Sequence, residues 1–421
     1  MHYFLYPTKD TYVTNDPTYM NKNMGLDEIM QLDKVMSQYS CASEFVYSEL
    51  IGYTSSSVEL LSGSMSASYN SGSTDTRVVS SSYVNVPGGI TPGSVLSRPL
   101  LQFDVSTVSQ SYASGRMGTG SFECFLNLKI CQSVESAVEY TIVAYPLAAP
   151  WVMGTGYRYD GAVTADGTTW KFSDVNGNKW AGPSGSLTDC SGGGIWYASG
   201  SIIESGSSVP RIGGYACSQS FNYESSDVSM DVTNIVKAWM SGSIPNYGLI
   251  LMHADQSSSI DYGSLKFFSK ETNTVYSPYI DVAWDDFRFV PTGSAGEITI
   301  DDAVVNIKNM NDEYKFGSIV RFNVTSRQRY PVKTFTNRLS DYLTPYYLPT
   351  SSFYCIKDAE SEMEIIPYDN YTKLSVDAKG NYFMLDTTGL PQERYFKVEI
   401  RTEQDGAILT YPIPTAFKIS R

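Results

Sequence analysis

Histidine is scarce in this chain of 421 residues, and this limits the chemistry that the sequence can support. Only His2 and His253 are present, so a Ser–His–Asp arrangement for nucleophilic catalysis would have to use one of them. His253 follows the apolar run LILM and is typical of an ordinary histidine at a strand end. Two histidines without a neighbouring cysteine cluster also do not form a typical zinc site.

The acidic residues offer two further kinds of chemistry. The segment DVNGNK places Asp174, Asn176 and Asn178 at alternating positions, as calcium-binding loops do. Gly177 stands fourth in that loop instead of sixth, and position 185 is Gly where a loop of that kind needs Glu, so an Asx turn is favoured. Paired carboxylates for glycoside hydrolysis stay open as a third hypothesis, although most acids lie in polar turns such as TADGT and ESEME. We expect no catalytic, cofactor-binding or metal-binding residue.

Aromatic residues in loop-rich sequence are the main candidates for binding. Exposed rings stack on sugars, and tyrosine suits protein interfaces because it offers a large contact area while losing little rotamer entropy. The candidates for glycan or protein contact are Trp151, Tyr157, Tyr159 and Trp196. The segment TPYYLPTSSFY adds Tyr346 and Tyr347, for which packing in the core or in a linker is an equal alternative.

Charge and hydropathy exclude several classes of partner. The formal net charge is −14 and charged residues make up only 18% of the chain, which argues against binding to nucleic acid or to anionic membranes. No run of about 18 apolar residues would span a bilayer. The opening MHYFLYPTKDTYV has neither a basic n-region nor an apolar h-region, so we expect no secretory signal.

The six cysteines form no CxxC pair and no even framework. Cys124 and Cys131 are seven positions apart in FECFLNLKICQ, which in a strand points them to opposite faces. We expect free buried thiols in a protein made in a reducing compartment.

One segment, DVTNIVKAWMSG, has the period of a helix. Asp231 can cap the first turn, and an apolar stripe at i, i+3, i+4 and i+7 predicts a buried face made of Val232, Ile235, Val236 and Trp239. Gly242 can end the helix, and LILM then reads as a buried strand. A short helix that buries a tryptophan between strands usually covers the open end or face of a sheet.

Most of the remaining chain consists of short alternating runs, which predict an all-β protein. A shift in composition predicts a linker over 286–297, with one domain over 1–285 and a second over 298–421. The second domain reads as about seven short strands at the spacing of a β-sandwich. Residues 41–90 are rich in Ser, Thr and Tyr and predict strands with an exposed insertion.

Five segments of residues 1–285, in order, resemble the DNRLRE-like jelly-roll family, which is allied to carbohydrate-binding modules. They are YPTKDTYVTNDPTYMNKNMGLDEIMQL, SRPLLQFDVSTV, the Trp- and Gly-rich stretch from APWVMGTGYRYDG to NKWAGPSG, DVTNIVKAWMSGSIPNYGLILMHADQ, and SPYIDVAW. The resemblance implies a jelly-roll sandwich whose core is closed by the helix with Trp239 inside, and a loop packed by Trp151, Trp170 and Trp180. The sequence departs from the family at Val152 and Met153, where an acidic residue often follows the first Trp, and in its longer regions 41–90 and 185–215.

Residues 298–421 resemble an immunoglobulin-like sandwich, on the form of GNYFMLDTTGL and RYFKVEIRTE. A jelly roll followed by an Ig-like domain, with few charges and free cysteines, is similar to structural proteins of tailed bacteriophages. The resemblance implies a non-enzymatic virion protein of the neck, tail, baseplate or capsid surface, made in the host cytoplasm. Its partners would be other virion proteins and copies of itself. The alternative is a glycan-binding adhesin or receptor-binding module that uses Trp151 or Trp196.

Overall fold

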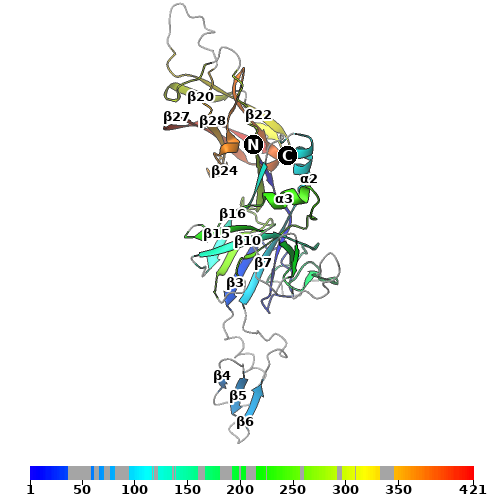
Figure 1. The fold of residues 1–421 in the computed structure, drawn as a ribbon. Coiled ribbons are helices and arrows are strands. Elements are labelled where there is room, and N and C mark those ends of the chain that lie inside the picture. The colour runs from blue at the N-terminus through cyan, green and yellow to red at the C-terminus, as the bar shows by residue number, and fades with distance from the viewer. Residues whose placement is uncertain are drawn as a thin grey trace, which may run out of the picture.

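The computed structural model describes residues 1–36, 94–115, 117, 122–134, 137, 139–159, 166–180, 192–198, 215–223, 225–256, 260–291, 296–308, 310–331 and 346–421, with the backbone alone of four further strands, Val58–Leu60, Ser66–Asn70, Thr76–Ser80 and Ser201–Glu204. This part of the chain is built from strands, with two short α-helices and short 3-10 turns. The prediction of an all-β protein made of sandwiches is confirmed (Figure 1). Among the described residues, no helix has the length and apolar character needed to cross a membrane.

The first sandwich packs two sheets around one large core. The smaller sheet has the strand order β1–β19–β8–β16, with bounds His2–Leu5, Tyr279–Trp284, Phe122–Leu128 and Val228–Asp231. The larger sheet has the order β15–β10–β17–β7–β3–β18–β9, with bounds Cys217–Asn222, Glu139–Pro146, Leu249–His253, Ser94–Phe103, Ile29–Met36, Gly263–Phe268 and Ile130–Val134. Strand β2 (Pro7–Thr14) also pairs with β7. Alternate residues of β8, such as Cys124 and Leu126, point into the core, as the period of two requires.

The helix predicted over 231–242 is present as α3 (Thr233–Met240). Oδ1 of Asp231 accepts a hydrogen bond from the backbone N–H of Thr233, and Gly242 follows the helix with φ of 73°. All four residues of the predicted stripe are buried in the first core: Val232, Ile235, Val236 and Trp239. The helix lies against the end of the sandwich that faces the second sandwich (Figure 1).

The prediction of a single covering helix is incomplete, because a second helix, α2, spans Ser106–Ala113. Oδ1 of Asp104 accepts a hydrogen bond from the N–H of Ser106 at its start. Val108 is its only buried residue. One buried apolar residue gives almost no helical periodicity, so the sequence pattern does not reveal this helix.

Loops cover the outer face of the larger sheet and create a second core in the first sandwich. This core joins Leu100 of β7, Val143 of β10 and Ile250 of β17 to loop residues that include four tryptophans: Trp151, Trp170, Trp180 and Trp196. The loops carry two small hairpins, formed by β11 (Phe172–Asp174) with β12 (Asn178–Lys179) and by β13 (Ile195–Ala198) with β14 (Ser201–Glu204). Because both faces of the sheet are covered, β17 is buried at all five positions and reads as an apolar run without alternation.

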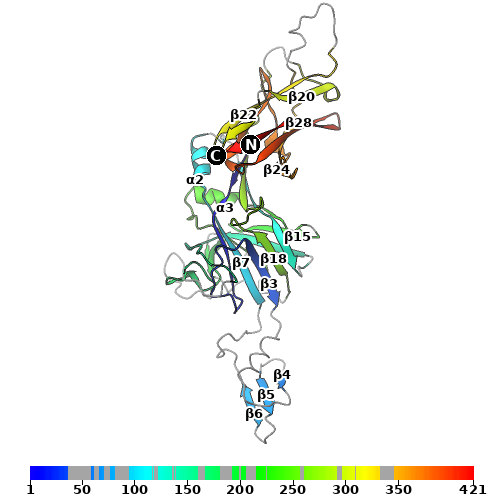
Figure 2. The same ribbon diagram turned by 180° about the vertical axis from the view of Figure 1, so that it is seen from behind.

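The second sandwich also contains two sheets around one core. One sheet has the order β20–β22–β26–β25, with bounds Ala303–Lys308, Ile319–Gln328, Gly380–Asp386 and Ser375–Asp377. The other has the order β21–β28–β27–β23–β24, with bounds Glu313–Lys315, Ala407–Ser420, Tyr395–Gln404, Ser352–Asp358 and Glu364–Ile366. Its core includes Phe322, Phe383 and Phe417. The two sandwiches lie end to end in both views (Figures 1 and 2).

The predicted linker over 286–297 is attached to the second sandwich along much of its length. The carbonyl of Arg288 accepts a hydrogen bond from the N–H of Val376, and the N–H of Val290 donates to the carbonyl of Val376. The ring of Phe289 packs edge-on against Tyr347. The segment is therefore docked by backbone pairing, which the composition of the sequence does not reveal.

A separate three-stranded sheet is formed by β4 (Val58–Leu60), β5 (Ser66–Asn70) and β6 (Thr76–Ser80). It lies beyond β3 and β7, at the end of the molecule opposite the second sandwich (Figures 1 and 2). The rest of the region predicted as an insertion over 41–90, and most of 185–215, lies outside the described residues.

Candidate functional site

Strand β1 builds the joint between the two sandwiches. Its backbone pairs with β19 of the first sandwich, with His2 opposite Ala283 and Leu5 opposite Ile280. The side chain of Phe4, however, is 5% exposed and belongs to the core of the second sandwich. One strand of four residues therefore contributes to both bodies. We use "the joint" for β1, Met1, Asp281, Asp286 and the turn 369–371.

His2 sits between carboxylates from the two sandwiches. Its Nδ1 lies 2.9 Å from Oδ2 of Asp281 on β19, and its Nε2 lies 3.0 Å from Oδ2 of Asp369 in the second sandwich. Only 2% of the His2 side chain is exposed. Burial acts to lower the pKa of His2, but the hydrogen bonds and charges of Asp281 and Asp369 outweigh it and raise that pKa to about 9.

Met1 forms the second polar contact of the joint. Its amino nitrogen donates to the carbonyl of Trp284 at 2.8 Å and to Oδ1 of Asp286 at 3.2 Å. It also donates to the carbonyl of Tyr371 in the second sandwich at 2.5 Å. Burial lowers the pKa of this amine, an effect that Asp286 opposes. The joint thus buries two basic groups, the His2 imidazole and the Met1 amine, and places a carboxylate beside each.

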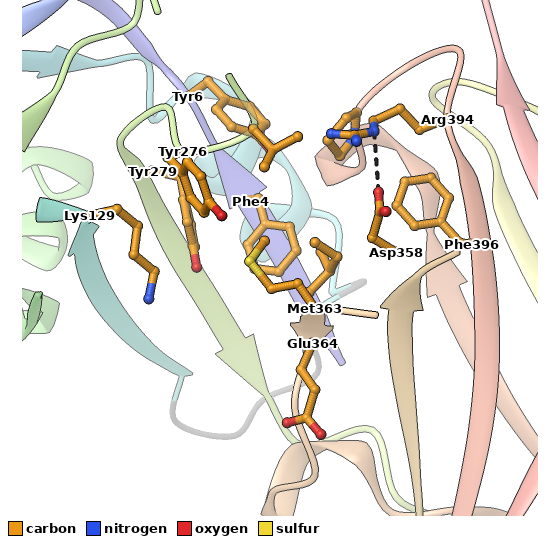
Figure 3. Close-up of a pocket in the computed structure, with 13 residues that line it drawn as sticks. Phe4, Tyr6, Lys129, Tyr276, Tyr279, Asp358, Met363, Glu364, Arg394 and Phe396 are labelled. Carbon is orange, nitrogen blue, oxygen red and sulfur yellow. Dashed lines mark ion pairs between the residues drawn. The ribbon is translucent and has the colours of Figure 1, made fainter. Parts of the chain in front are cut away.

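A cavity of about 110 Å³ opens on another side of the same strand (Figure 3). Residues of the first sandwich form one wall and residues of the second form the other; among those lining it are Phe4, Tyr6, Tyr276, Tyr279, Met363 and Phe396. Its charged residues are paired: Arg394 Nε with Asp358 at 3.2 Å, Lys129 with Asp227 at 3.0 Å, and Glu364 with Lys357 at 3.7 Å. The cavity therefore has an aromatic and apolar lining with a balanced charged rim.

The prediction that Trp151 and Trp196 offer rings to a ligand is wrong for this structure. They are 3% and 1% exposed, respectively, and both pack in the second core of the first sandwich. Nε1 of Trp151 donates to the carbonyl of Tyr247 at 2.8 Å. A loop-rich sequence suggested surface rings, but these loops fold back onto the sheet and bury them.

Tyr157 and Tyr159 do lie on the surface, with 46% and 81% of each residue exposed. They flank Arg158, whose guanidinium lies 4.2 Å from the ring centre of Tyr19. The ring of Tyr159 packs edge-on against Tyr19. These residues form an exposed aromatic surface on the first sandwich, separate from the joint.

Tyr346 and Tyr347, predicted either as contact residues or as packed in the core or a linker, are half-buried and take part in backbone pairing. Tyr346 bridges to Ser326, and Tyr347 bridges to Glu297. Tyr346 also packs against the core of the second sandwich. The structure therefore favours the packing alternative for these two tyrosines.

Sequence reasoning missed Arg98, which is 2% exposed within β7. Its guanidinium lies between two rings, 4.9 Å from the centre of Trp170 and 5.3 Å from that of Trp196. Nη1 donates to the carbonyl of Gly193 and Nη2 to Oε1 of Gln256. Gly193 has φ of +80°, and an added Cβ would come within 2.6 Å of both Arg98 and Trp170. The presence of an arginine inside the apolar run SRPLLQF was the sequence feature that could have indicated a buried Arg98.

His253 lies at the same end of the larger sheet and is also buried, at 1% exposure. Its ring stacks on Tyr262 at 5.0 Å, and neither ring nitrogen has a hydrogen-bond partner among the described residues. Burial, aided by the charge of Lys34, lowers the pKa of His253 to about 3. We use "the aromatic end" for Arg98, Trp170, Trp196, His253 and Tyr262. A hollow of about 440 Å³ lies beside it, lined in part by Tyr140, Phe221 and Tyr262.

The remaining chemical candidates adopt ordinary roles. Oδ1 of Asp174 accepts from the N–H of Asn176, so DVNGNK forms the expected Asx turn. Within the described ranges, no three His, Cys, Asp or Glu side chains gather closely enough to hold a metal ion. Four cysteines are described and all are free, but Cys131 is exposed, contrary to the expectation of buried thiols.

Comparison with known proteins adds little. No protein-family model matches the chain, and no curated protein matches it. One solved structure that shows a weak match is a DUF4785 family protein from Legionella pneumophila, at 10% sequence identity and a TM-score of 0.16. The match covers 72% of this chain and 62% of that protein, so the chain spans less than two thirds of its length. A TM-score this low supports no argument about fold or function.

Proposed function

We propose that this chain is a non-enzymatic structural protein of a tailed-phage virion, acting through contacts with other proteins. The proposal takes the first body, residues 1–285, as a jelly roll and the second, residues 298–421, as an Ig-like domain. The joint carries the proposal. A strand shared by two sandwiches, with buried charge pairs across them, suits a part that must hold two binding faces in a fixed relation.

The structural roles of the buried ionisable groups support a non-enzymatic function. His2 and Arg98, buried basic side chains of the joint and the aromatic end, hold segments of the fold together. Exposed aromatic residues occur on both sandwiches and provide contact surface; they include Tyr159, Tyr223, Tyr330 and Tyr395. A net charge of −14 would keep free subunits soluble before assembly.

The edges of the second sandwich also suit controlled assembly. β28 pairs with β27 along most of its length, whereas β21 pairs with it only at residues 418–420. Pro412 and Pro414 lie along this strand, and proline cannot donate to a further strand. Unwanted pairing of free subunits edge to edge is thereby discouraged, which leaves side-chain surfaces to direct specific contacts.

Mass spectrometry of density-purified particles from the source tests the proposal. We expect peptides of this chain to band with the particles in fixed ratio to the major capsid protein. A ratio near that of the portal would place it at the neck or tail, and a much higher ratio on the capsid surface. Detection in the soluble fraction alone would overturn the proposal.

The second candidate function is a glycan-binding module, and the exposure of Tyr157 and Tyr159 favours it. Changing Tyr159 to Ala should abolish binding on a glycan array while leaving the melting temperature unchanged. Tyr330, which is 79% exposed on the second sandwich, provides the matched control variant, Tyr330→Ala. Equal binding by both variants and by the unaltered chain would remove the Tyr159 surface as a sugar site.

A further inference from the structure

Two carboxylates flank the His2 imidazole, and this arrangement favours the protonated, charged ring. Nδ1 is hydrogen-bonded to Asp281 at 2.9 Å, and Nε2 lies 3.0 Å from Oδ2 of Asp369 as an ion pair whose angle does not meet hydrogen-bond geometry. A neutral imidazole carries a single N–H and can face only one carboxylate with a donor. Only the imidazolium presents an N–H to each. The contact that spans the two sandwiches therefore exists in full only while His2 is charged.

We propose that His2 is a proton-dependent latch, whose imidazolium holds the two sandwiches in one fixed relation and whose loss of a proton releases the second sandwich from the first. Asp281 holds the imidazolium in the first sandwich, and Asp369 binds it from the second sandwich. The proposal concerns the joint itself and stands or falls independently of any role in a virion.

The other charged groups of the joint reinforce this dependence. Burial lowers the pKa of the Met1 amine below its usual value of 8.0, so the amine loses its proton before His2 does, and a neutral His2 would leave Asp281 and Asp369 as neighbouring carboxylates without a cation between them. Removing one partner from a buried pair is unfavourable because the remaining charge stays poorly solvated. The further titratable groups around this site are Asp285, Glu123, Cys124, Tyr279, Tyr354 and Tyr371. None of them is a second strong base that could replace His2.

The direction of the pH response follows from the raised pKa of His2. Its contribution is fully present below the usual histidine pKa of 6.5 and is lost as the pH rises through about 9. On the acid side, burial alone would raise the pKa of Asp369, but the contacts with His2 hold it below its usual value. The latch is therefore closed at neutral pH and opens in alkali.

An NMR titration of the whole chain tests the latch without any substitution. The chain has only two histidines, so the two sets of imidazole signals serve as site and internal control. We expect the imidazole of His2 to titrate near pH 9 and that of His253 to stay neutral down to about pH 4. The variant Asp369→Asn should lower the pKa of His2 by more than one unit, whereas Asp377→Asn, at an exposed pair, should leave it unchanged. Titration of His2 near pH 6.5 would overturn the proposal.

Small-angle X-ray scattering tests the release. The unaltered chain should show a larger radius of gyration at pH 10 than at pH 7. His2→Gln should show the larger value at both pH values, because it never carries the charge. An unchanged radius for the unaltered chain across this range would show that the sandwiches stay locked without the proton, and would refute the latch even if His2 titrates near pH 9.

Discussion

The joint and the aromatic end of the first sandwich both bury cationic side chains, but they stabilise them differently. At the joint, His2 faces two carboxylates. At the aromatic end, no described carboxylate pairs with Arg98, and two tryptophan rings and two oxygen acceptors surround it instead. Burial lowers the pKa of Arg98 to about 9, so it still keeps its charge at neutral pH.

This difference matches what each region does. The carboxylate partners raise the pKa of His2 to about 9 and link segments from the two sandwiches. Ring faces and carbonyl groups do not titrate near neutrality, and Arg98 itself keeps its charge up to about pH 9. Between pH 6.5 and about 9 the joint is therefore the part whose stability should respond to pH through its cationic side chain, whereas the contribution of Arg98 should change only above about pH 9.

The largest effect should come from Arg98→Ala. It leaves a cavity between Trp170 and Trp196 and removes the donors to Gly193 and Gln256, so we expect a loss of about 4 kcal/mol in unfolding free energy, as for disrupted core sites. Urea denaturation followed by tryptophan fluorescence measures it, and the loss should be equal at pH 7 and pH 8. Arg321 also stacks on a ring, that of Tyr382, but is exposed, and Arg321→Ala should cost less than about 1 kcal/mol. Equal losses for both variants would contradict the role of burial.

Phe4→Ala should produce the next largest effect and act at the joint. Phe4 belongs to the second core while its backbone pairs with β19, so its loss should destabilise the second sandwich by about 3 kcal/mol, the usual cost of such a truncation. Calorimetry should show one transition for the unaltered chain and two for the variant. Tyr330, which is 79% exposed on the second sandwich, gives the control Tyr330→Ala. A single transition in the Phe4 variant would show that the strand does not couple the two bodies.

Helix α3 and the joint show what the sequence could and could not predict. The helix α3 follows from local periodicity, because Val232, Ile235 and Val236 lie within one turn of each other. The joint depends on His2 meeting Asp281 and Asp369, which are hundreds of positions away, and no local pattern encodes such a contact.

The prediction of contact rings at Trp151 and Trp196 fails for a related reason, although the packing of Trp151, Trp170 and Trp180 that the family resemblance implied is present. Glycine- and serine-rich sequence around Trp151 and Trp196 indicates loops, and loops usually lie on the surface. Here the larger sheet has apolar residues on its outer face too, including Val143 and Ile250, and the loops cover them. The unbroken apolar run at β17 carried this information, because a strand buried on both faces does not alternate.

Asp281→Asn should have a moderate effect that depends on pH. Asparagine keeps the shape but removes the charge opposite His2, so we expect a loss of about 2 kcal/mol at pH 7, within the range for charge-assisted hydrogen bonds. The loss should shrink as the pH rises through about 9, because the unaltered chain then loses the imidazolium as well. Urea denaturation at pH 7 and pH 9.5 measures both values. A loss that is the same at both would show that Asp281 acts only through packing.

His253→Phe should have the smallest effect at neutral pH and the opposite pH dependence. Phenylalanine keeps the stacking on Tyr262 and removes two buried nitrogens without partners, so we expect a change within about 1 kcal/mol at pH 7. The pKa of His253 is lowered to about 3, so below pH 6.5 the unfolded chain takes up a proton that the folded chain refuses. The unaltered chain should therefore lose more stability than the variant between pH 6.5 and pH 4, as urea denaturation at these two values would show. Parallel losses would mean that His253 is hydrated or protonated in the folded chain, and the contrast with His2 would then disappear.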